Sequence, residues 1–346
     1  MARSVTAPEV LDFVQGHPDF SSKEIHTGLG TDAGYATLKR TLKDLVKKGH
    51  LATSGKGKST RYKLSAGFEI LAPVDLDEYF KKEIDERSIK QTFNHDLIGT
   101  LRNVSLFDAD ELNELHALQQ KYERKSKELS AQQYRQELER LAIDLSWKSS
   151  QIEGNTYSLL ETERLLKEKE TAEGKTRDEA TMLLNHKEAL DFIIENPDHI
   201  MPLSVARIEE IHSMLIKDLG VERNIRSRRV GVTGTNYRPL ENEFQIREAL
   251  EAMCDLIRVQ ENVFSKALLG LVLLSYIQAF NDGNKRTARI ISNAILINSH
   301  YCPLSFRTID PITYKKAMLL FYEQNNITAF KKLFIEQVRF AVETYF

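Results

Sequence analysis

The sequence predicts a mainly α-helical protein with a small N-terminal part and a larger C-terminal part. The chain has 346 residues, of which 41% are hydrophobic, so it can supply a sizeable core. From Asp108 onward, apolar residues recur at helical spacing between capping residues. Signals for strands fall in two short stretches, residues 49–64 and 230–239. We therefore expect helical packing throughout, with a hairpin at each of these two places.

Composition excludes several classes of protein. The formal net charge of −2 excludes a strongly basic protein. Cys254 and Cys302 are too few and too far apart for a disulfide framework or a zinc site, which favours a reducing cytosol, and we expect both thiols to be buried. The longest apolar run, which ends at Ile277, is too short to span a bilayer, and the N-terminus has no signal-type core. A cytoplasmic location without a membrane partner follows as an expectation.

Residues 1–65 predict three short helices followed by a hairpin. Apolar spacing indicates the first helix near Val10 and the third from Leu38 to Val46, and Ser21 is a cap for the second. A glycine-containing turn at residues 54–58 then separates two strands. This order resembles a winged helix-turn-helix domain, in which the third helix enters the DNA major groove and the wing touches the backbone.

The charge of this segment suits such a role. It carries 11 Lys and Arg against 6 Asp and Glu. The cations expected on the third helix and the wing, where they can meet phosphates of double-stranded DNA, are Lys39, Arg40, Lys43, Lys56, Lys58 and Arg61. Winged helices also serve as dimerisation or protein-docking modules, so a homodimer or a docking role is the alternative to DNA binding.

The remainder predicts a connector and one all-α domain. Residues 66–100 are mixed in character and are expected to form the connector, with one short helix. Residues 101–346 are expected to form the helical domain. Its predicted helices cover residues 108–127, 132–150, 158–168, 176–195, 203–217, 244–259 and 310–324.

The loop at residues 278–289, Gln-Ala-Phe-Asn-Asp-Gly-Asn-Lys-Arg-Thr-Ala-Arg, predicts a phosphate site. It joins the nearly all-apolar run Leu268–Ile277 to a second helix with an apolar period. Gly283 allows a tight turn and Asn284 tolerates unusual dihedral angles. The next helix is expected to begin near Lys285, with its free N–H groups and positive dipole end facing the loop.

Charged side chains strengthen this prediction. Arg286 and Arg289 are three residues apart, so we expect them on one helix face, where two guanidinium groups can grip successive phosphates. Asp282 can hold a divalent cation.

The loop resembles the signature of the Fic (Fido) family, His-x-Phe-x-Asp/Glu-Gly-Asn-Gly/Lys-Arg-x-x-Arg. Members of this family transfer AMP, or less often other phosphate-containing groups, from a nucleotide to hydroxyls of target proteins. The chain matches at Phe280, Asp282, Gly283, Asn284, Lys285, Arg286 and Arg289. The resemblance covers residues 101–346 and implies ATP as substrate or ligand, Mg²⁺ held by Asp282, and nucleotide binding by Asp282, Gly283, Asn284, Lys285, Arg286 and Arg289.

The chain departs from the pattern at its first position. The family's histidine, which takes the proton from the target hydroxyl, is replaced by Gln278. An amide has no accessible pKa near neutrality, and a positioned base contributes roughly 10²–10⁴ in rate. His212 is the one histidine in an apolar-periodic stretch that suggests a substitute base, but an interior histidine is the favoured interpretation. Lys285 adds a second uncertainty, because lysine at this position occurs in relatives that transfer phosphate instead of AMP.

A second segment resembles the family's inhibitory motif, Ser/Thr-x-x-x-Glu-Gly/Asn. Ser149 and Glu153 are four residues apart near the end of a predicted helix, and Gly154 provides its stop. The resemblance implies that Glu153 pairs with Arg289 and keeps the γ-phosphate of the nucleotide from seating productively. The alternative is a plain helix end with one acidic residue.

Residues 230–239 predict a small hairpin, because β-branched residues and glycines interrupt the helical pattern. The segment resembles the family's flap, which binds a target polypeptide as an added strand. Thr233, Gly234, Thr235 and Tyr237 would then contact the target, whereas the alternative is a connector hairpin without a partner. A basic cluster just before it, formed by Arg223, Arg226, Arg228 and Arg229, faces either phosphates or solvent.

Two functions therefore stand side by side. The first is a self-inhibited Fic-type protein adenylyltransferase acting on an unidentified target protein, with chemistry weakened or altered by Gln278. The second is a catalytically inactive, nucleotide-sensing, DNA-binding transcriptional regulator. A toxin-like protein with DNA autoregulation is a third and weaker hypothesis.

Overall fold

The computed structural model of the protein describes residues 5–30 and 33–346. It is mainly helical, as predicted, and its described residues include one three-stranded sheet. The chain divides into two compact units, one formed by the residues up to Pro73 with Gly99–Val104 and the other by Val74–Ile98 with Ser105–Phe346. The predicted connector is thus shared between the two units. Among the described residues, no helix combines the length and apolar character needed to cross a bilayer.

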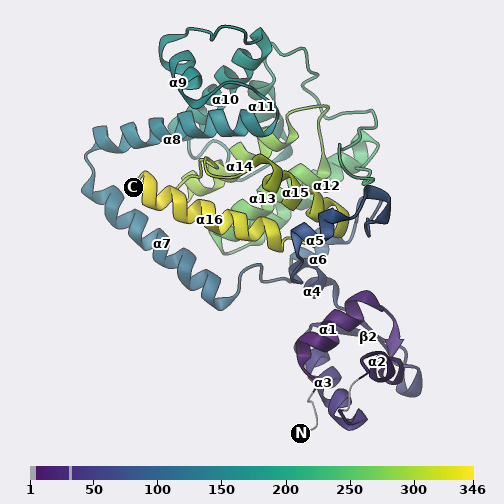
Figure 1. Cartoon of the computed structure of the whole chain (residues 1–346). Helices are drawn as coiled ribbons and strands as arrows, with labels where there is room; N and C mark the ends of the chain where they lie inside the picture. Colours follow the sequence, from purple (N-terminus) through teal and green to yellow (C-terminus); the bar gives the residue numbers. More distant parts are fainter. Residues whose placement is uncertain (1–4, 31–32) are drawn as a thin grey trace. The chain divides into compact units, whose positions relative to one another are not determined.

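The N-terminal unit has the predicted three helices followed by a hairpin (Figure 1). The helices are α1 (Ala7–Gly16), α2 (Ser22–Gly28) and α3 (Tyr35–Lys47), and the strands are β1 (Phe20–Ser21), β2 (Leu51–Ser54) and β3 (Arg61–Leu64). Ser21 caps α2, since its hydroxyl accepts the Glu24 amide. The antiparallel sheet has the order β1-β3-β2, with Leu51 opposite Leu64. The sequence did not predict β1, because two residues carry no detectable period.

Apolar side chains from all three helices and the hairpin form the core of this unit. The fully buried members include Val10, Val14, Ile25, Leu38 and Leu42. The wing between β2 and β3 contains the 3₁₀ turn η1 (Gly57–Ser59) and depends on Gly55. Gly55 has a φ of +75°, and a Cβ there would lie 2.5 Å from the Ser59 carbonyl oxygen. Only glycine fits this position.

The connector contains three short helices rather than the one predicted. These are α4 (Ala66–Leu71), α5 (Leu76–Lys81) and α6 (Leu97–Leu101), with the 3₁₀ turn η2 (Ile84–Glu86) between the last two. Beyond it lie α7 (Ala109–Glu128), α8 (Ala131–Ile152), α9 (Leu159–Glu168), α10 (Arg177–Glu195), α11 (Val205–Leu215), α12 (Glu243–Val259), α13 (Val263–Ile277), α14 (Asn284–Asn298), α15 (Pro311–Gln324) and α16 (Thr328–Thr344).

The helices α13 and α14 form the centre of the larger unit. Every residue from Leu268 to Ile277 is buried, as the unbroken apolar run requires. Helices α8, α10 and α11 pack on α14, whereas α12 and α15 pack on α13. The loop between α13 and α14 is therefore held from several sides by other helices.

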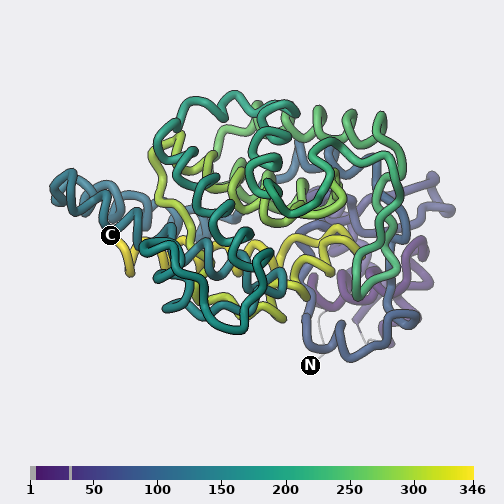
Figure 2. The backbone as a smooth tube through the Cα atoms, turned by 90° about the horizontal axis from the view of Figure 1, so that it is seen from above, coloured from purple at the N-terminus to yellow at the C-terminus, as the bar shows by residue number. Residues whose placement is uncertain are grey.

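The helix α16 was not predicted, although its apolar residues recur at helical spacing. Phe330, Phe334, Val338 and Val342 are all buried, and α16 packs on α7 and α15. Figure 2, turned by 90°, shows its C-terminal end close to the segment between α7 and α8. There the ring of Phe346 lies 4.9 Å from that of Tyr122.

The hairpin predicted for residues 230–239 is wrong. The segment is extended around a turn at Thr233 and Gly234, and it contains no pair of strands. Its one bridge joins Arg238 in parallel to Thr92 of the connector. The β-branched residues and glycines do signal an extended segment, but the partner lies far away in the sequence, so a local pattern could not reveal it.

Candidate active site

The loop from Gln278 to Gly283 joins two buried helices through two left-handed residues. Gln278 caps the C-terminus of α13 with a φ of +52° and a ψ of +56°, a conformation that costs a non-glycine residue about 1–2 kcal/mol. Gly283 caps the N-terminus of α14 with a φ of +80°. A Cβ on Gly283 would lie 3.2 Å from Ile216 and 3.3 Å from His212. The loop therefore rests tightly on α11, and glycine is required at its second turn.

Asn284 ties the two ends of this loop together. Its side-chain oxygen accepts the Phe280 amide at 2.8 Å, and its amide nitrogen donates to the Phe280 carbonyl at 2.7 Å. Asn284 is the first residue of α14 and is helical. The unusual dihedral angle is therefore found at Gly283, although the sequence suggested that Asn284 could also adopt one. The amide side chain of Asn284 is needed for its two opposite hydrogen-bonding functions.

His212 lies beneath the loop as an interior residue. Its ring is fully buried and stacks on Phe280 with 3.6 Å between ring centroids. Nε2 lies 2.9 Å from the Asp282 carbonyl and Nδ1 3.2 Å from the Arg223 carbonyl. Burial lowers the pKa of His212. Held in this way, His212 supports the loop and does not replace the absent base.

The Gln278 side chain is fixed by its neighbours. Its amide nitrogen donates to the Ser275 carbonyl at 2.6 Å and lies 3.3 Å from the Tyr322 hydroxyl, and its amide oxygen accepts from Asn284 at 3.3 Å. These contacts hold the Gln278 side chain in one position. Its amide group cannot accept a proton near neutrality.

Arg226 anchors the same residue from the opposite side, and sequence reasoning missed this role. Its guanidinium is 1% exposed and donates to the carbonyls of Gln278, Arg228 and Leu240 at 2.6, 2.8 and 2.6 Å. The basic cluster before the flap is therefore not one phosphate-binding patch. Arg229 instead forms an exposed pair with Glu241. A guanidinium has five donors in a fixed fork, which suits three separate carbonyls.

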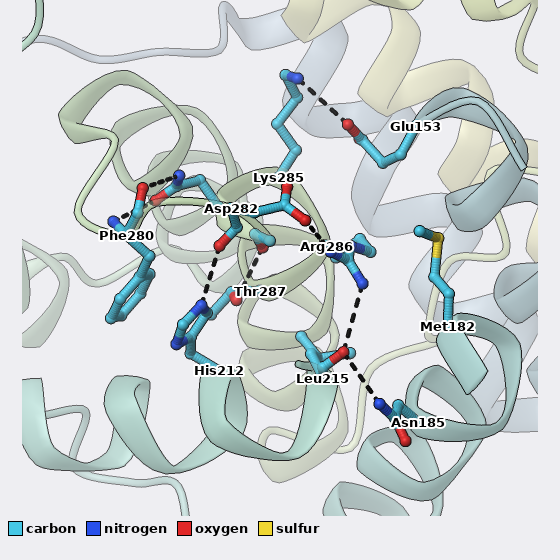
Figure 3. A network of polar contacts seen from close by, with 12 residues as sticks. Glu153, Met182, Asn185, His212, Leu215, Phe280, Asp282, Lys285, Arg286 and Thr287 are labelled. Carbon is cyan, nitrogen blue, oxygen red and sulfur yellow. Dashed lines mark hydrogen bonds and ion pairs between the residues drawn. The ribbon is translucent and has the colours of Figure 1, made fainter. Parts of the chain in front are cut away.

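Glu153 binds two cations of α14. One carboxylate oxygen lies 2.8 Å from Nη2 of Arg289, and the other lies 3.2 Å from Nζ of Lys285, a contact drawn in Figure 3. Ser149, one turn earlier on α8, accepts from Nε of Arg289 at 2.8 Å and through its carbonyl from Nη2 at 3.0 Å. The expected pair between Glu153 and Arg289 is thus joined by Lys285, which the sequence did not suggest as a partner.

These charges fix the protonation of the carboxylate. Burial alone would raise the pKa of Glu153, but the positive charges of Arg289 and Lys285 outweigh it and lower the pKa to about 2. Glu153 is 19% exposed in its side chain and Arg289 is fully buried. Of this ion pair, the Glu153 carboxylate is therefore the partner exposed to solvent.

Arg286 is not among the residues that line the cavity beside the loop, and its contact with a phosphate stays a prediction. Its side chain is 1% exposed, and it donates to Oδ2 of Asp282 at 2.8 Å and to the Leu215 carbonyl at 3.3 Å (Figure 3). Arg286 therefore orients Asp282 from below. Asp282 itself is 60% exposed, as a carboxylate that meets a cation must be.

A cavity of about 450 Å³ opens over the loop. Its walls come from the end of α8, the flap, the loop with the first turn of α14, and α15: Ile152, Glu153, Gly231, Val232, Thr233, Gln278, Asn281, Asp282, Gly283, Asn284, Lys285, Tyr314, Lys315, Met318, Leu319 and Tyr322. The wall thus combines cations and the N-terminus of α14 with apolar and aromatic side chains. Such a combination suits a ligand that has both an anionic part and a flat apolar part.

The donor set also fits a divalent cation that arrives with phosphates. Among the described residues, no group of three or more His, Cys, Asp or Glu side chains could hold a metal by itself. Asp282 offers one exposed carboxylate at the cavity wall. Mg²⁺ is commonly held by one or two carboxylates, substrate phosphates and waters.

The flap residues divide into two groups. Thr233 lines the cavity, whereas Tyr237 is only 2% exposed and stacks on Tyr276 with 4.8 Å between centroids. Tyr237 is thus buried against α13, and its contact with a target stays a prediction. Thr235 accepts the Tyr237 amide and stabilises the turn that carries Gly234.

The six cations predicted to meet DNA are all exposed. Those on α3 are Lys39, Arg40 and Lys43, and those of the hairpin are Lys56, Lys58 and Arg61. Arg61 pairs with Glu24 of α2 at 2.5 Å, so it is the least available of the six. Both cysteines are buried, as expected.

Comparison with known proteins agrees with these two parts. Residues 202–296 match the Fic/DOC family and residues 6–121 match the penicillinase repressor family. The chain therefore carries a Fic/DOC domain, which contains the loop and the flap, together with an N-terminal winged-helix domain.

Its relatives include two named protein adenylyltransferases. The chain is 28% identical over 176 residues to the protein adenylyltransferase Fic of Nematostella vectensis, which covers 49% of this chain and 40% of that protein. It is 26% identical over 159 residues to fic-1 of Caenorhabditis elegans, covering 44% and 31%. The chain thus matches well under half of the length of these relatives.

Solved structures share the fold. Fic-1 from C. elegans superposes with a TM-score of 0.59 at 20% identity, covering 68% of this chain and 72% of that one. A Fic domain containing signaling protein from Bacteroides thetaiotaomicron gives 0.57 at 19% identity, covering 67% and 96%. At these identities the likeness establishes the fold and nothing more.

Proposed function

We propose that this protein binds ATP with Mg²⁺ in a self-inhibited state and transfers AMP to a hydroxyl of another protein at a reduced rate. The observation that carries the proposal is the double ion pair of Glu153 with Arg289 and Lys285 at the wall of a cavity over a helix N-terminus. A carboxylate placed on two cations of an anion site occupies the position that a phosphate would take.

Residues of the loop and of the first turns of α14 have separate parts in this proposal. The amides at the start of α14, with Gly283 allowing close approach, hold phosphate oxygens, and Asp282 oriented by Arg286 holds Mg²⁺. Arg289 stabilises phosphate charge once Glu153 has moved. ATP supplies the group that is transferred. Because nucleotidyl transfer depends largely on positioning and electrostatics, a slow reaction can persist without a base at Gln278.

Lys285 leaves the identity of the transferred group to experiment. The proposal names AMP because the relatives are named adenylyltransferases, and phosphate is the alternative. ATP labelled separately at the α- and γ-phosphates distinguishes the two, since only the α-label is retained after AMP transfer.

The experiment compares the protein as it stands with Glu153→Gly and with Glu153→Gly/Gln278→His, each incubated with labelled ATP and a cell extract. We expect label on protein only after Glu153 has been replaced, and more label when histidine is restored. ATP bound by every form with no label on any protein would instead support the nucleotide sensor.

A DNA-binding role is the second candidate function, favoured by the match to the penicillinase repressor family and by the exposed cations of α3. Replacing Lys39, Arg40 and Lys43 by alanine should weaken binding to double-stranded DNA and make it less dependent on salt. Replacing Arg61 alone should have the smaller effect, because Glu24 already neutralises it. Equal losses in the two variants would contradict this assignment of the surface.

A further inference from the structure

We infer that the connector residues 79–92, here called the strap, position the flap, residues 230–239, over the cavity, with Arg87 as the principal positioning residue. This inference rests on the proposed function only in assigning a purpose to the flap. The contacts themselves all lie within the larger unit.

Arg87 joins the strap to both the flap and α15. Its Nη1 lies 3.0 Å from Oε1 of Glu323, and its Nη2 donates to the Gly234 carbonyl at 2.9 Å. The side chains of Arg87 and Glu323 are 4% and 0% exposed. A buried pair of this kind imposes a fixed geometry, because removing either partner leaves an uncompensated charge.

Glu323 is held by further groups of the strap. The Tyr79 hydroxyl donates to its other carboxylate oxygen at 2.6 Å, and the Lys90 amide donates to its backbone carbonyl at 2.7 Å. Since α15 also supplies Tyr314 and Tyr322 to the cavity wall, the strap is attached to the same helix that forms one side of the site.

The flap is bound to the strap along its length. The Asn236 side chain donates to Asp85 at 3.0 Å, and the Arg238 amide donates to the Gln91 carbonyl at 2.8 Å. Arg238 also forms the parallel bridge with Thr92. The backbone of the flap near Arg238 is therefore already paired with the strap. A target strand added to the flap must pair instead with residues Gly231–Thr233, which line the cavity.

The purpose of this arrangement follows from the composition of the flap. A segment with two glycines and no regular structure loses much conformational entropy when ordered. Bonds to Gly234, Asn236 and Arg238 from one rigidly held segment supply the order that the missing hairpin would have given. Target registration then depends on residues that do not line the cavity.

Hydrogen–deuterium exchange of the full chain tests the inference with three variants. Glu323→Gln keeps an acceptor for Arg87 and keeps the bond from Arg87 to Gly234. Arg87→Met removes both contacts, and Arg87→Met/Glu323→Gln removes them without leaving a buried carboxylate unpaired. Urea unfolding of each variant measures global stability in parallel.

We expect exchange in peptides covering residues 230–239 to accelerate at least tenfold in both variants that lack Arg87 and less than twofold in Glu323→Gln. Peptides of α14 should be unaffected. Flap protection that instead follows global stability, recovering in the double variant, would show that Arg87 acts only through stability and would overturn the inference.

Binding of ATP separates this inference from the proposed function. In a Glu153→Gln background, ATP should still bind when Arg87 is replaced, because the cations and helix N–H groups that would hold the phosphates lie on α14 and make no contact with the strap, whereas a more mobile flap can lower the affinity by a few-fold. Faster flap exchange with ATP still bound supports the strap. If no form binds ATP, the proposed function fails while the exchange result still decides the positioning role.

Discussion

Replacing Glu153 by glutamine should raise the affinity for ATP and leave the affinity for AMP unchanged. Glutamine keeps the size of the side chain but removes the charge that binds Arg289 and Lys285. In addition, the amide NH₂ of glutamine would face one of the two cations. The position that residue 153 takes in this structure, on Arg289 and Lys285, is here called the closed position. It should therefore lose most of its stabilisation.

The structure gives a magnitude for this release. A shift of the Glu153 pKa from 4.5 to about 2 corresponds to about 3.5 kcal/mol in favour of the ionised carboxylate bound to Arg289 and Lys285, at about 1.4 kcal/mol for each pH unit. The general cost of breaking a buried pair, about 3–5 kcal/mol, agrees with this value. If ATP needs Arg289, its affinity should increase by up to about 300-fold.

Isothermal titration calorimetry with Mg²⁺-ATP and with AMP is the assay, at pH 7.5 and moderate salt. AMP is the matched control ligand, since it has no γ-phosphate to compete with Glu153. Ser149→Ala is the matched control variant, because it removes a neutral acceptor of Arg289 and should change ATP affinity only a few-fold. Equal ATP affinity in the wild type and Glu153→Gln would refute the reasoning.

Three further predictions concern pH, packing and thiols. The lowered pKa of Glu153 means that its ionised carboxylate stabilises the closed state fully above pH 4.5, and that this effect is lost only as the pH falls toward about 2. The difference in ATP affinity between wild type and Glu153→Gln should therefore stay constant from pH 5.5 to 8.5. Calorimetry showing that this difference disappears by pH 6 would contradict the prediction. Phe280→Ala should cost about 3–5 kcal/mol in urea unfolding, since the ring is fully buried against His212, and a loss below about 1 kcal/mol would contradict the packing. Burial raises the pKa of Cys254 to about 12 and raises that of Cys302 well above its ordinary value, so neither thiol should react with a disulfide reagent at pH 8 until the protein is unfolded.

The sequence predicted the larger features because their signals are local. The apolar run before Gln278 and the capping residue Ser21 identify helices from a few neighbouring side chains, and the structure has these helices. The same holds for the left-handed turn at Gly283. The apolar period of α16 is equally local, although this helix was not predicted.

The features that could not be predicted depend on partners distant in the sequence. Lys285 meets Glu153 only because α8 ends beside the first turn of α14. Tyr237 is buried because α13 offers Tyr276 as a stacking surface. Arg226 belongs to a run of arginines that look alike in sequence, and its side chain is held by the carbonyls of Leu240 and Gln278, 14 and 52 residues away, as well as by that of Arg228. No periodicity or motif encodes such meetings.

The buried guanidinium of Arg226 has a consequence for any imidazole introduced at position 278. All three of its side-chain hydrogen bonds go to backbone oxygens, one of them the carbonyl of residue 278, so its positive charge lies close to where the ring would attach. A nearby cation in a poorly hydrated interior disfavours imidazolium. A histidine at position 278 should therefore have a lowered pKa and be neutral at physiological pH, so that it can accept a proton. The amide of Gln278 does not titrate and so gains nothing from this positive charge.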